Sequence, residues 1–216
     1  MQIMQSETYF KVRAFSDLRQ MLRQSVALYG NLPAFRYREQ PDGEVIKRTY
    51  REVGEDTDAL GTALLGLGLA DENIAIIGEN SYRWSISHLA IINGVGISVP
   101  LDRLLKADEI LPLLERGKVS AVIFDQSYTD TMITASERFP SIRSFICMNC
   151  TDPTSDRFAD DARWYRFDAL MATGRKRLGE GHSEYADRPI DPEQIASLLF
   201  TSGTTSMSKG VLLRNR

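Results

Sequence analysis

The sequence lacks several features that define whole classes of protein. Its 26 Lys and Arg against 29 Asp and Glu leave no basic excess of the kind that accompanies nucleic-acid binding. Only two cysteines occur in 216 residues, which excludes a disulfide-dense scaffold and favours a reducing compartment. The first twenty residues carry charges and no apolar core, so no signal peptide is predicted. We therefore expect a cytoplasmic protein that does not bind nucleic acid.

A long hydrophobic run is also missing. Residues 84–101 contain no formal charge, but they include His88, Asn93, Gly94 and Pro100. A membrane span needs about 20 predominantly apolar residues, so this stretch predicts a buried helix followed by a buried strand. No transmembrane segment is expected, and only peripheral contact with a membrane stays open.

The two cysteines, Cys147 and Cys150, have C-x-x-C spacing. That spacing fits a disulfide, a redox pair or half of a zinc site. No second pair exists, and His88 and His182 are far away in sequence. Because Cys147 ends the apolar run 145–147, packing in the core is the favoured interpretation.

The rest of the chain alternates between strand and helix patterns. Two short strands around 41–43 predict a β-hairpin, and Thr49 with Glu52 forms a capping box that begins a helix ending near residues 66–68. Further helices are expected at 81–93, 107–116, 128–139 and 167–178, and strands at 74–77, 97–99, 121–124, 144–148 and 196–201. Pro112 should lie in the first turn of its helix or kink it.

This alternation predicts an α/β fold with a largely parallel sheet, helices on both faces and a preceding hairpin. The ranges 151–161 and 179–192 are polar connections. The acids of the first match no calcium loop, so we expect a solvated loop there.

The segment that suggests chemistry follows the last buried strand. Residues 201–210 read TSGTTSMSKG, in which six of ten residues are Ser or Thr, two are Gly and one is Lys. Small side chains let backbone N–H groups approach an anion, and the lysine adds a charge that suits phosphate. The carboxyl end of a parallel strand is also where α/β sheets bind ligands. Composition alone equally allows a polar hairpin loop without a ligand.

Three short motifs nearly match this segment and fail. A Walker A loop needs Gly-Lys-Ser/Thr where the chain has Ser208-Lys209-Gly210, and it opens a helix rather than the strand expected at 211–213. The S-x-x-K of β-lactamases matches at 206–209, but neither S-D-N nor K-T-G occurs. Phe200 occupies the position at which a nucleophile elbow around Ser202 would need glycine.

A longer signature matches better. Residues 201–211 resemble T-S-G-[ST]-T-G-x-P-K-G-V, the phosphate-binding signature of AMP-forming adenylating enzymes, which include acyl-CoA synthetases, luciferases and peptide-synthetase adenylation domains. Eight of the ten fixed positions agree, and Ser206 and Ser208 replace Gly and Pro.

Upstream blocks extend the resemblance over about residues 15–213. They are 49–52 (TYRE), 73–84 (NIAIIGENSYRW) and 89–102 (LAIINGVGISVPLD). Residues 170–175 and 191–196 look most like the long-chain fatty acyl-CoA synthetase branch.

The resemblance implies ATP-dependent activation of a fatty acid to an acyl-adenylate, followed by transfer to coenzyme A, with Mg²⁺ accompanying ATP. The implied phosphate-binding residues are Thr201, Ser202, Gly203, Thr204, Thr205 and Lys209. No catalytic or metal-ligating residue is implied within this chain.

It also implies that the chain is the N-terminal part of a larger AMP-binding domain. The parts are an N-terminal segment (1–32), the hairpin (33–50), βαβ units (51–200) and the phosphate loop (201–210). We therefore expect the full-length enzyme, and not these residues alone, to be active. Two alternatives stay open: a degenerate, non-catalytic relative, suggested by Ser206 and Ser208, and a ligase for another carboxylic acid.

Overall fold

The computed structural model describes residues 13–150, 161–201 and 209–216. Most of the predicted loop at 151–161 therefore lies outside the described residues. The described strands are β1 (Pro33–Tyr37), β2 (Ile46–Thr49), β3 (Asn73–Ile77), β4 (Ile97–Pro100), β5 (Val119–Phe124), β6 (Ser144–Cys147), β7 (Trp164–Arg166), β8 (Ile195–Thr201) and β9 (Lys209–Arg214). The α-helices are α1 (Leu18–Tyr29), α2 (Tyr50–Gly66), α3 (Tyr82–Ala90), α4 (Ala107–Arg116), α5 (Thr129–Arg138), α7 (Phe167–Gly179) and α8 (Glu184–Asp187).

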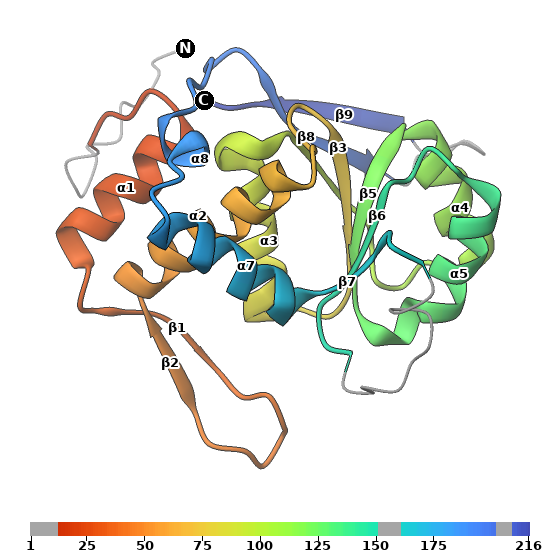
Figure 1. The fold of residues 1–216 in the computed structure, drawn as a ribbon, viewed down its shortest axis with the longest axis horizontal. Helices are drawn as coiled ribbons and strands as arrows, with labels where there is room; N and C mark the ends of the chain where they lie inside the picture. Colours follow the sequence, from red (N-terminus) through yellow and green to blue (C-terminus); the bar gives the residue numbers. More distant parts are fainter. Residues whose placement is uncertain (1–12, 151–160, 202–208) are drawn as a thin grey trace, which may run out of the picture.

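Seven strands form one sheet in the order β7-β6-β5-β3-β4-β8-β9 (Figure 1). Strands β3 to β8 are parallel, and only the edge strand β9 is antiparallel to its neighbour. The strand order reverses at β3, which has β4 on one side and β5 on the other. The predicted α/β class and the mostly parallel sheet are confirmed.

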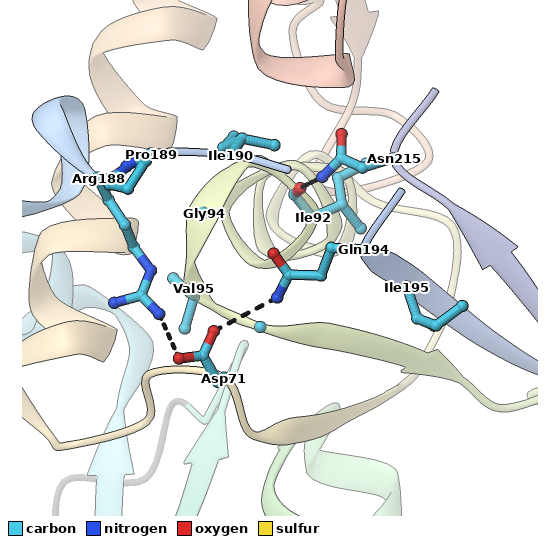
Figure 2. A pocket seen from close by; sticks show the side chains of 11 residues that line it. Asp71, Ile92, Gly94, Val95, Arg188, Pro189, Ile190, Gln194, Ile195 and Asn215 are labelled. Atoms are coloured by element: carbon cyan, nitrogen blue, oxygen red, sulfur yellow. Dashed lines mark hydrogen bonds and ion pairs between the residues drawn. The ribbon is translucent and has the colours of Figure 1, made fainter. Parts of the chain in front are cut away.

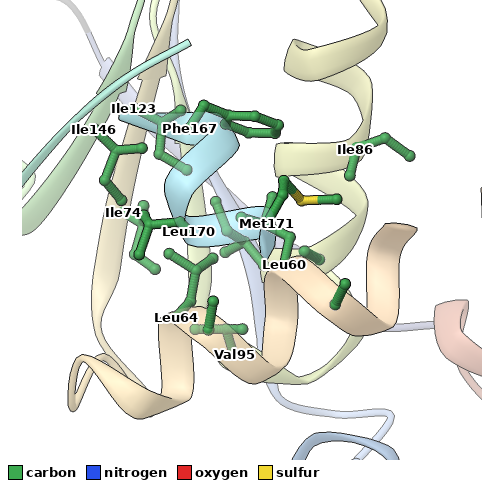
Figure 3. Close-up of a cluster of buried hydrophobic side chains, with 14 of the residues drawn as sticks. Leu60, Leu64, Ile74, Ile86, Val95, Ile123, Ile146, Phe167, Leu170 and Met171 are labelled. Atoms are coloured by element: carbon green, nitrogen blue, oxygen red, sulfur yellow. The ribbon is translucent and has the colours of Figure 1, made fainter. Parts of the chain in front are cut away.

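Alternating side chains of each strand supply two cores. Ile74 and Ile76 of β3 belong to a cluster covered by α2, α3 and α7 (Figure 3). Ala75 and Ile77 point to the other face, where α4 and α5 cover a second cluster. A strand buried on both faces reads as a continuous apolar run, which is why 74–77 could be recognised from sequence.

The predicted hairpin is present as β1 and β2, paired antiparallel and extending away from the main sheet in Figure 1. The Tyr37 ring stacks on Tyr82 of α3, with ring centroids 5.4 Å apart. The capping box of α2 is also confirmed, because the Thr49 hydroxyl accepts from the Glu52 N–H at 3.2 Å and the Thr49 N–H donates to the Glu52 carboxylate at 2.6 Å.

The helix predicted through residue 93 differs in its last turn. Ser81 caps it as expected, but the α-helix ends at Ala90 and a π-helical turn, Ile91–Val95, follows. Gly94 adopts φ of 136°, a conformation that side chains rarely tolerate, and this glycine lets the chain leave the turn for β4.

Pro112 lies in the second turn of α4, inside the helix rather than in its first turn. A proline at this position leaves the carbonyl of Asp108 without its helical donor. Asp108 is exposed, so solvent can bond that carbonyl instead.

Three described elements were not predicted: α1 within the N-terminal segment, the three-residue strand β7 and the one-turn helix α8. Cys147 is buried as expected. It is also joined to Cys150 by a disulfide, whereas the favoured interpretation was packing in the core without a bond. In the part of the chain that the structure describes, no helix has the length and apolar character needed to cross a membrane.

Candidate functional site

The candidate phosphate loop is carried by the β8–β9 hairpin. Strand β8 pairs in parallel with β4, with Ser197 opposite Ser98, so its last residue reaches the same sheet edge as the carboxyl ends of β3, β4 and β5. Strand β9 returns antiparallel, with Lys209 opposite Thr201. The hairpin therefore places Thr201 and Lys209 at the carboxyl edge of the sheet, where α/β folds bind ligands.

The structure describes two of the predicted site residues, Thr201 and Lys209. They pair with each other where β8 ends and β9 begins. Thr201 and Lys209 are both exposed, and the Thr201 hydroxyl donates to the Lys209 carbonyl at 3.4 Å. Ser202, Gly203, Thr204 and Thr205 lie outside the described residues. Their role in phosphate binding, like that of Thr201 and Lys209, stays a prediction.

The base of the hairpin is anchored to the sheet. Phe200 packs against the core under α4 and α5, and the Arg116 guanidinium lies 5.7 Å from its ring centre. Gly210 faces Phe200 across the hairpin, and a Cβ atom there would come within 3.0 Å of the Leu198 side chain. The strand ends are thus fixed in register while Lys209 remains accessible to a ligand.

A cavity of about 510 Å³ lies beside the hairpin, between α3 and strands β8 and β9. Its wall includes Trp84 and His88 of α3, which stack with ring centroids 5.4 Å apart. His88 Nδ1 lies 2.9 Å from the Ser98 hydroxyl, and burial lowers the pKa of His88, so its imidazole is neutral at pH 7. Sequence reasoning placed His88 in a buried helix but did not find this cavity, because its lining comes from separate segments.

Figure 2 shows a polar contact that ties the segment before β8 to the start of β3. The Asp71 carboxylate accepts from Arg188 at 2.5 Å and from Gln194 at 3.4 Å. The adjoining space of about 10 Å³ holds nothing larger than a water molecule. Nearby, the Asn215 amide donates to the Ile92 carbonyl at 2.8 Å. These contacts hold both strands of the hairpin against the sheet and do not form a ligand site.

The Asp71 contact predicts a pH-dependent contribution to stability. Its hydrogen bond with Arg188 holds the pKa of Asp71 below its usual range, so the stabilisation is complete above about pH 5 and is lost as the pH falls through the folded-state pKa. The pair is partly exposed, so its contribution is at most about 1 kcal/mol. Asp71→Asn should therefore lower the free energy of unfolding at pH 7, and the difference from the parent should shrink towards pH 3. Urea denaturation at both pH values measures this, and an equal difference at both would contradict it.

Side chains that could ligate a metal ion are spread over the described residues. No group of three or more His, Cys, Asp or Glu side chains comes together among them.

Comparison with known proteins shows the family of the chain. The AMP-binding enzyme family profile matches residues 22–216. The chain belongs to the AMP-binding enzyme family. Its members' phosphate signature is the one that residues 201–211 resemble, so the resemblance stated from the sequence is confirmed at the level of the family.

Curated relatives of this AMP-binding chain include acid–CoA ligases. The chain is 28% identical over 211 residues to long-chain-fatty-acid–CoA ligase 5 of Rattus norvegicus. The aligned region covers 94% of this chain and 30% of that protein. It is 30% identical over 205 residues to long chain acyl-CoA synthetase 4 of Arabidopsis thaliana. That alignment covers 90% of this chain and 29% of the synthetase. The chain thus spans about 30% of the length of these relatives.

A solved structure confirms the fold of this AMP-binding chain. The adenylation domain of the carboxylate reductase from Mycobacterium chelonae superposes with a TM-score of 0.76 at 19% identity, covering 95% of this chain and 35% of that one. At this identity the match supports the fold, and it does not indicate which carboxylic acid the protein uses.

Proposed function

We propose that the full-length protein activates a long-chain fatty acid with ATP and transfers the acyl group to coenzyme A. The observation that carries the proposal is the β8–β9 hairpin, which brings Thr201 and Lys209 together at the carboxyl edge of a parallel sheet. The relatives that are fatty acid–CoA ligases support the choice of acid.

The proposed reaction has two steps. The fatty acid carboxylate attacks the α-phosphorus of ATP, which forms the acyl-adenylate and releases pyrophosphate. The thiolate of coenzyme A then attacks the acyl carbonyl carbon, and AMP leaves. In the first step charge accumulates on the departing pyrophosphate, and fixed donors and cations lower the barrier by offsetting that charge.

The proposed role of the loop follows from this charge. The Lys209 ammonium and the hydroxyl and backbone N–H groups of Thr201, Ser202, Gly203, Thr204 and Thr205 would bind the β- and γ-phosphates. None of these residues serves as a nucleophile or general base. Their contribution is orientation and electrostatic stabilisation, which require only that the hairpin present them together.

The test is ATP–pyrophosphate exchange by the purified full-length protein with a long-chain fatty acid, an aromatic acid, an amino acid and no added acid. We expect exchange that depends on the fatty acid. Exchange only with another acid would replace the proposed substrate class, and exchange with none would leave the non-catalytic relative as the better account. The 216 residues alone are expected to give no exchange, since they make up only about 30% of a relative's length.

The two departures from the family signature allow a separate prediction. Ser206→Gly should relieve about 1 kcal/mol of strain if residue 206 is left-handed, and Ser208→Pro should reduce the entropy of the free loop. We expect the double variant of the full-length protein to bind ATP severalfold more tightly by calorimetry. Weaker binding would mean that the two hydroxyl groups themselves contact the nucleotide.

A further inference from the structure

Cys147 and Cys150 form a short disulfide ring at the carboxyl end of β6. Their Cα atoms are 5.7 Å apart, and two residues, Met148 and Asn149, lie between them in the sequence. They are the only cysteines of the chain, and the phosphate loop uses neither of them. No group of three or more potential ligands occurs among the described residues, so the pair is not completed there as a metal site.

The two cysteine residues differ in exposure. Cys147 is 1% exposed and belongs to the apolar cluster that includes Phe145 and Trp164. Cys150 is only half-buried and packs at the margin of the same cluster. Thiol–disulfide exchange requires a thiolate to reach one of the two sulfur atoms, so an external thiol meets Cys150 first.

The ring encloses a turn whose polar atoms hold three neighbouring segments. The Met148 carbonyl accepts from Arg83 of α3, and the Cys150 carbonyl accepts from Arg166 of β7 at 3.3 Å. The Asn149 side-chain oxygen accepts from the Gln126 N–H at 2.7 Å, just after β5. Opening the ring therefore loosens a turn to which α3, β7 and the end of β5 are attached.

The fold itself depends little on the bond. A disulfide stabilises a protein chiefly by restricting the unfolded chain, and a ring of this length restricts it least. The strands on both sides of β6 are held to it by backbone pairing, and two apolar clusters of many other side chains pack on the sheet. The reduced protein should therefore remain folded, which is the condition for a reversible change.

We infer that Cys147 and Cys150 form a reversible dithiol–disulfide site that reacts with external thiols through Cys150. A thiolate of the reductant attacks the Cys150 sulfur, the bond to Cys147 breaks, and the Cys147 thiolate takes a proton from water. A second thiolate then attacks the reductant sulfur of the mixed disulfide and releases Cys150, which is protonated in turn. Two electrons pass to the chain, and the reductant becomes a disulfide.

The first experiment measures reduction in the native state. The full-length protein is incubated with dithiothreitol without denaturant, alkylated with N-ethylmaleimide and analysed by peptide mass spectrometry at both cysteines. We expect no alkylation before reduction, alkylation of both cysteines after it, and restoration of the bond by oxidised glutathione. Reduction only in denaturant, or free thiols in the air-exposed protein, would overturn the inference.

Matched variants test the direction of attack. In Cys147→Ala, oxidised glutathione should form a mixed disulfide on Cys150, and in Cys150→Ala the adduct on Cys147 should form about tenfold more slowly. Equal rates in two folded variants would contradict attack at Cys150.

Because alanine at position 147 leaves a small cavity, hydrogen exchange of the unmodified protein gives a second readout. Reduction should speed exchange in the turn and in the first turn of α3, and leave β8 unchanged, whereas an unchanged turn would contradict the inference.

Discussion

Replacing Lys209 by alanine in the full-length protein should slow adenylate formation about ten- to a hundredfold. The lysine is the first residue of β9, it is exposed, and no described carboxylate forms an ion pair with it. One charge-assisted hydrogen bond contributes roughly 1.5–3 kcal/mol, and the same energy in the transition state gives that change in rate. ATP–pyrophosphate exchange measures the effect.

The control for this variant is Lys47→Ala. Lys47 is also exposed and also lies in a two-stranded pairing, but it belongs to the β1–β2 hairpin, away from the main sheet (Figure 1). We expect normal exchange and an unchanged melting temperature for Lys47→Ala, and a reduced rate with an unchanged melting temperature for Lys209→Ala. If both variants exchange at the parent rate, Lys209 is not part of the phosphate site.

Gly174→Ala should destabilise the protein by about 2–3 kcal/mol, because α2 and α7 cross at this glycine. A Cβ atom built there would lie 1.9 Å from the carbonyl oxygen of Ala59 and 2.7 Å from its carbonyl carbon. These are backbone atoms of a helix that is itself buried against the sheet, so they cannot move aside as a side chain could. For a domain of this size we expect a loss of about 5–10 °C in melting temperature.

Gly179→Ala is the matched control, since Gly179 is the last residue of the same helix. No atom lies within 4 Å of a Cβ atom built there, so alanine meets no obstacle and gains up to about 1 kcal/mol of helix propensity. Its melting temperature should equal or exceed that of the parent. A Gly174→Ala variant that melts no lower than Gly179→Ala would show that the two helices separate readily.

The sequence predicted the central strands β3, β5 and β6 well because they are buried on both faces of the sheet. The run 74–77 is apolar throughout, and Thr49 with Glu52 marked the start of α2 through a pattern that the structure reproduces. The two strands of the β8–β9 hairpin were predicted from the apolar runs 197–200 and 211–213, although the structure leaves residues 198–200 only half-buried and β9 exposed along its whole length.

The missed elements had weaker signals. Strand β7 has three residues and exists through its pairing with β6, which no local pattern reveals. Helix α1 has apolar residues at positions 18, 22 and 26, a spacing that could have identified it. The disulfide depends on the turn after β6 bringing Cys150 back towards Cys147, and spacing alone leaves several outcomes open.

The contacts of the Asn215 side chain affect the order in which parts of the protein fold during synthesis. Besides its bond to Ile92, its oxygen accepts from the Leu18 N–H at 2.9 Å, a contact between residues 197 positions apart. Strand β8 likewise finds its partner β4 about a hundred residues earlier. On the ribosome, β3 to β7 can pair while the chain is still growing, because domains begin to fold during synthesis. The contact between the Leu18 N–H and Asn215 can form only after Asn215 has emerged, so the β8–β9 hairpin and the first turn of α1 reach their final positions after β3 to β7 have paired.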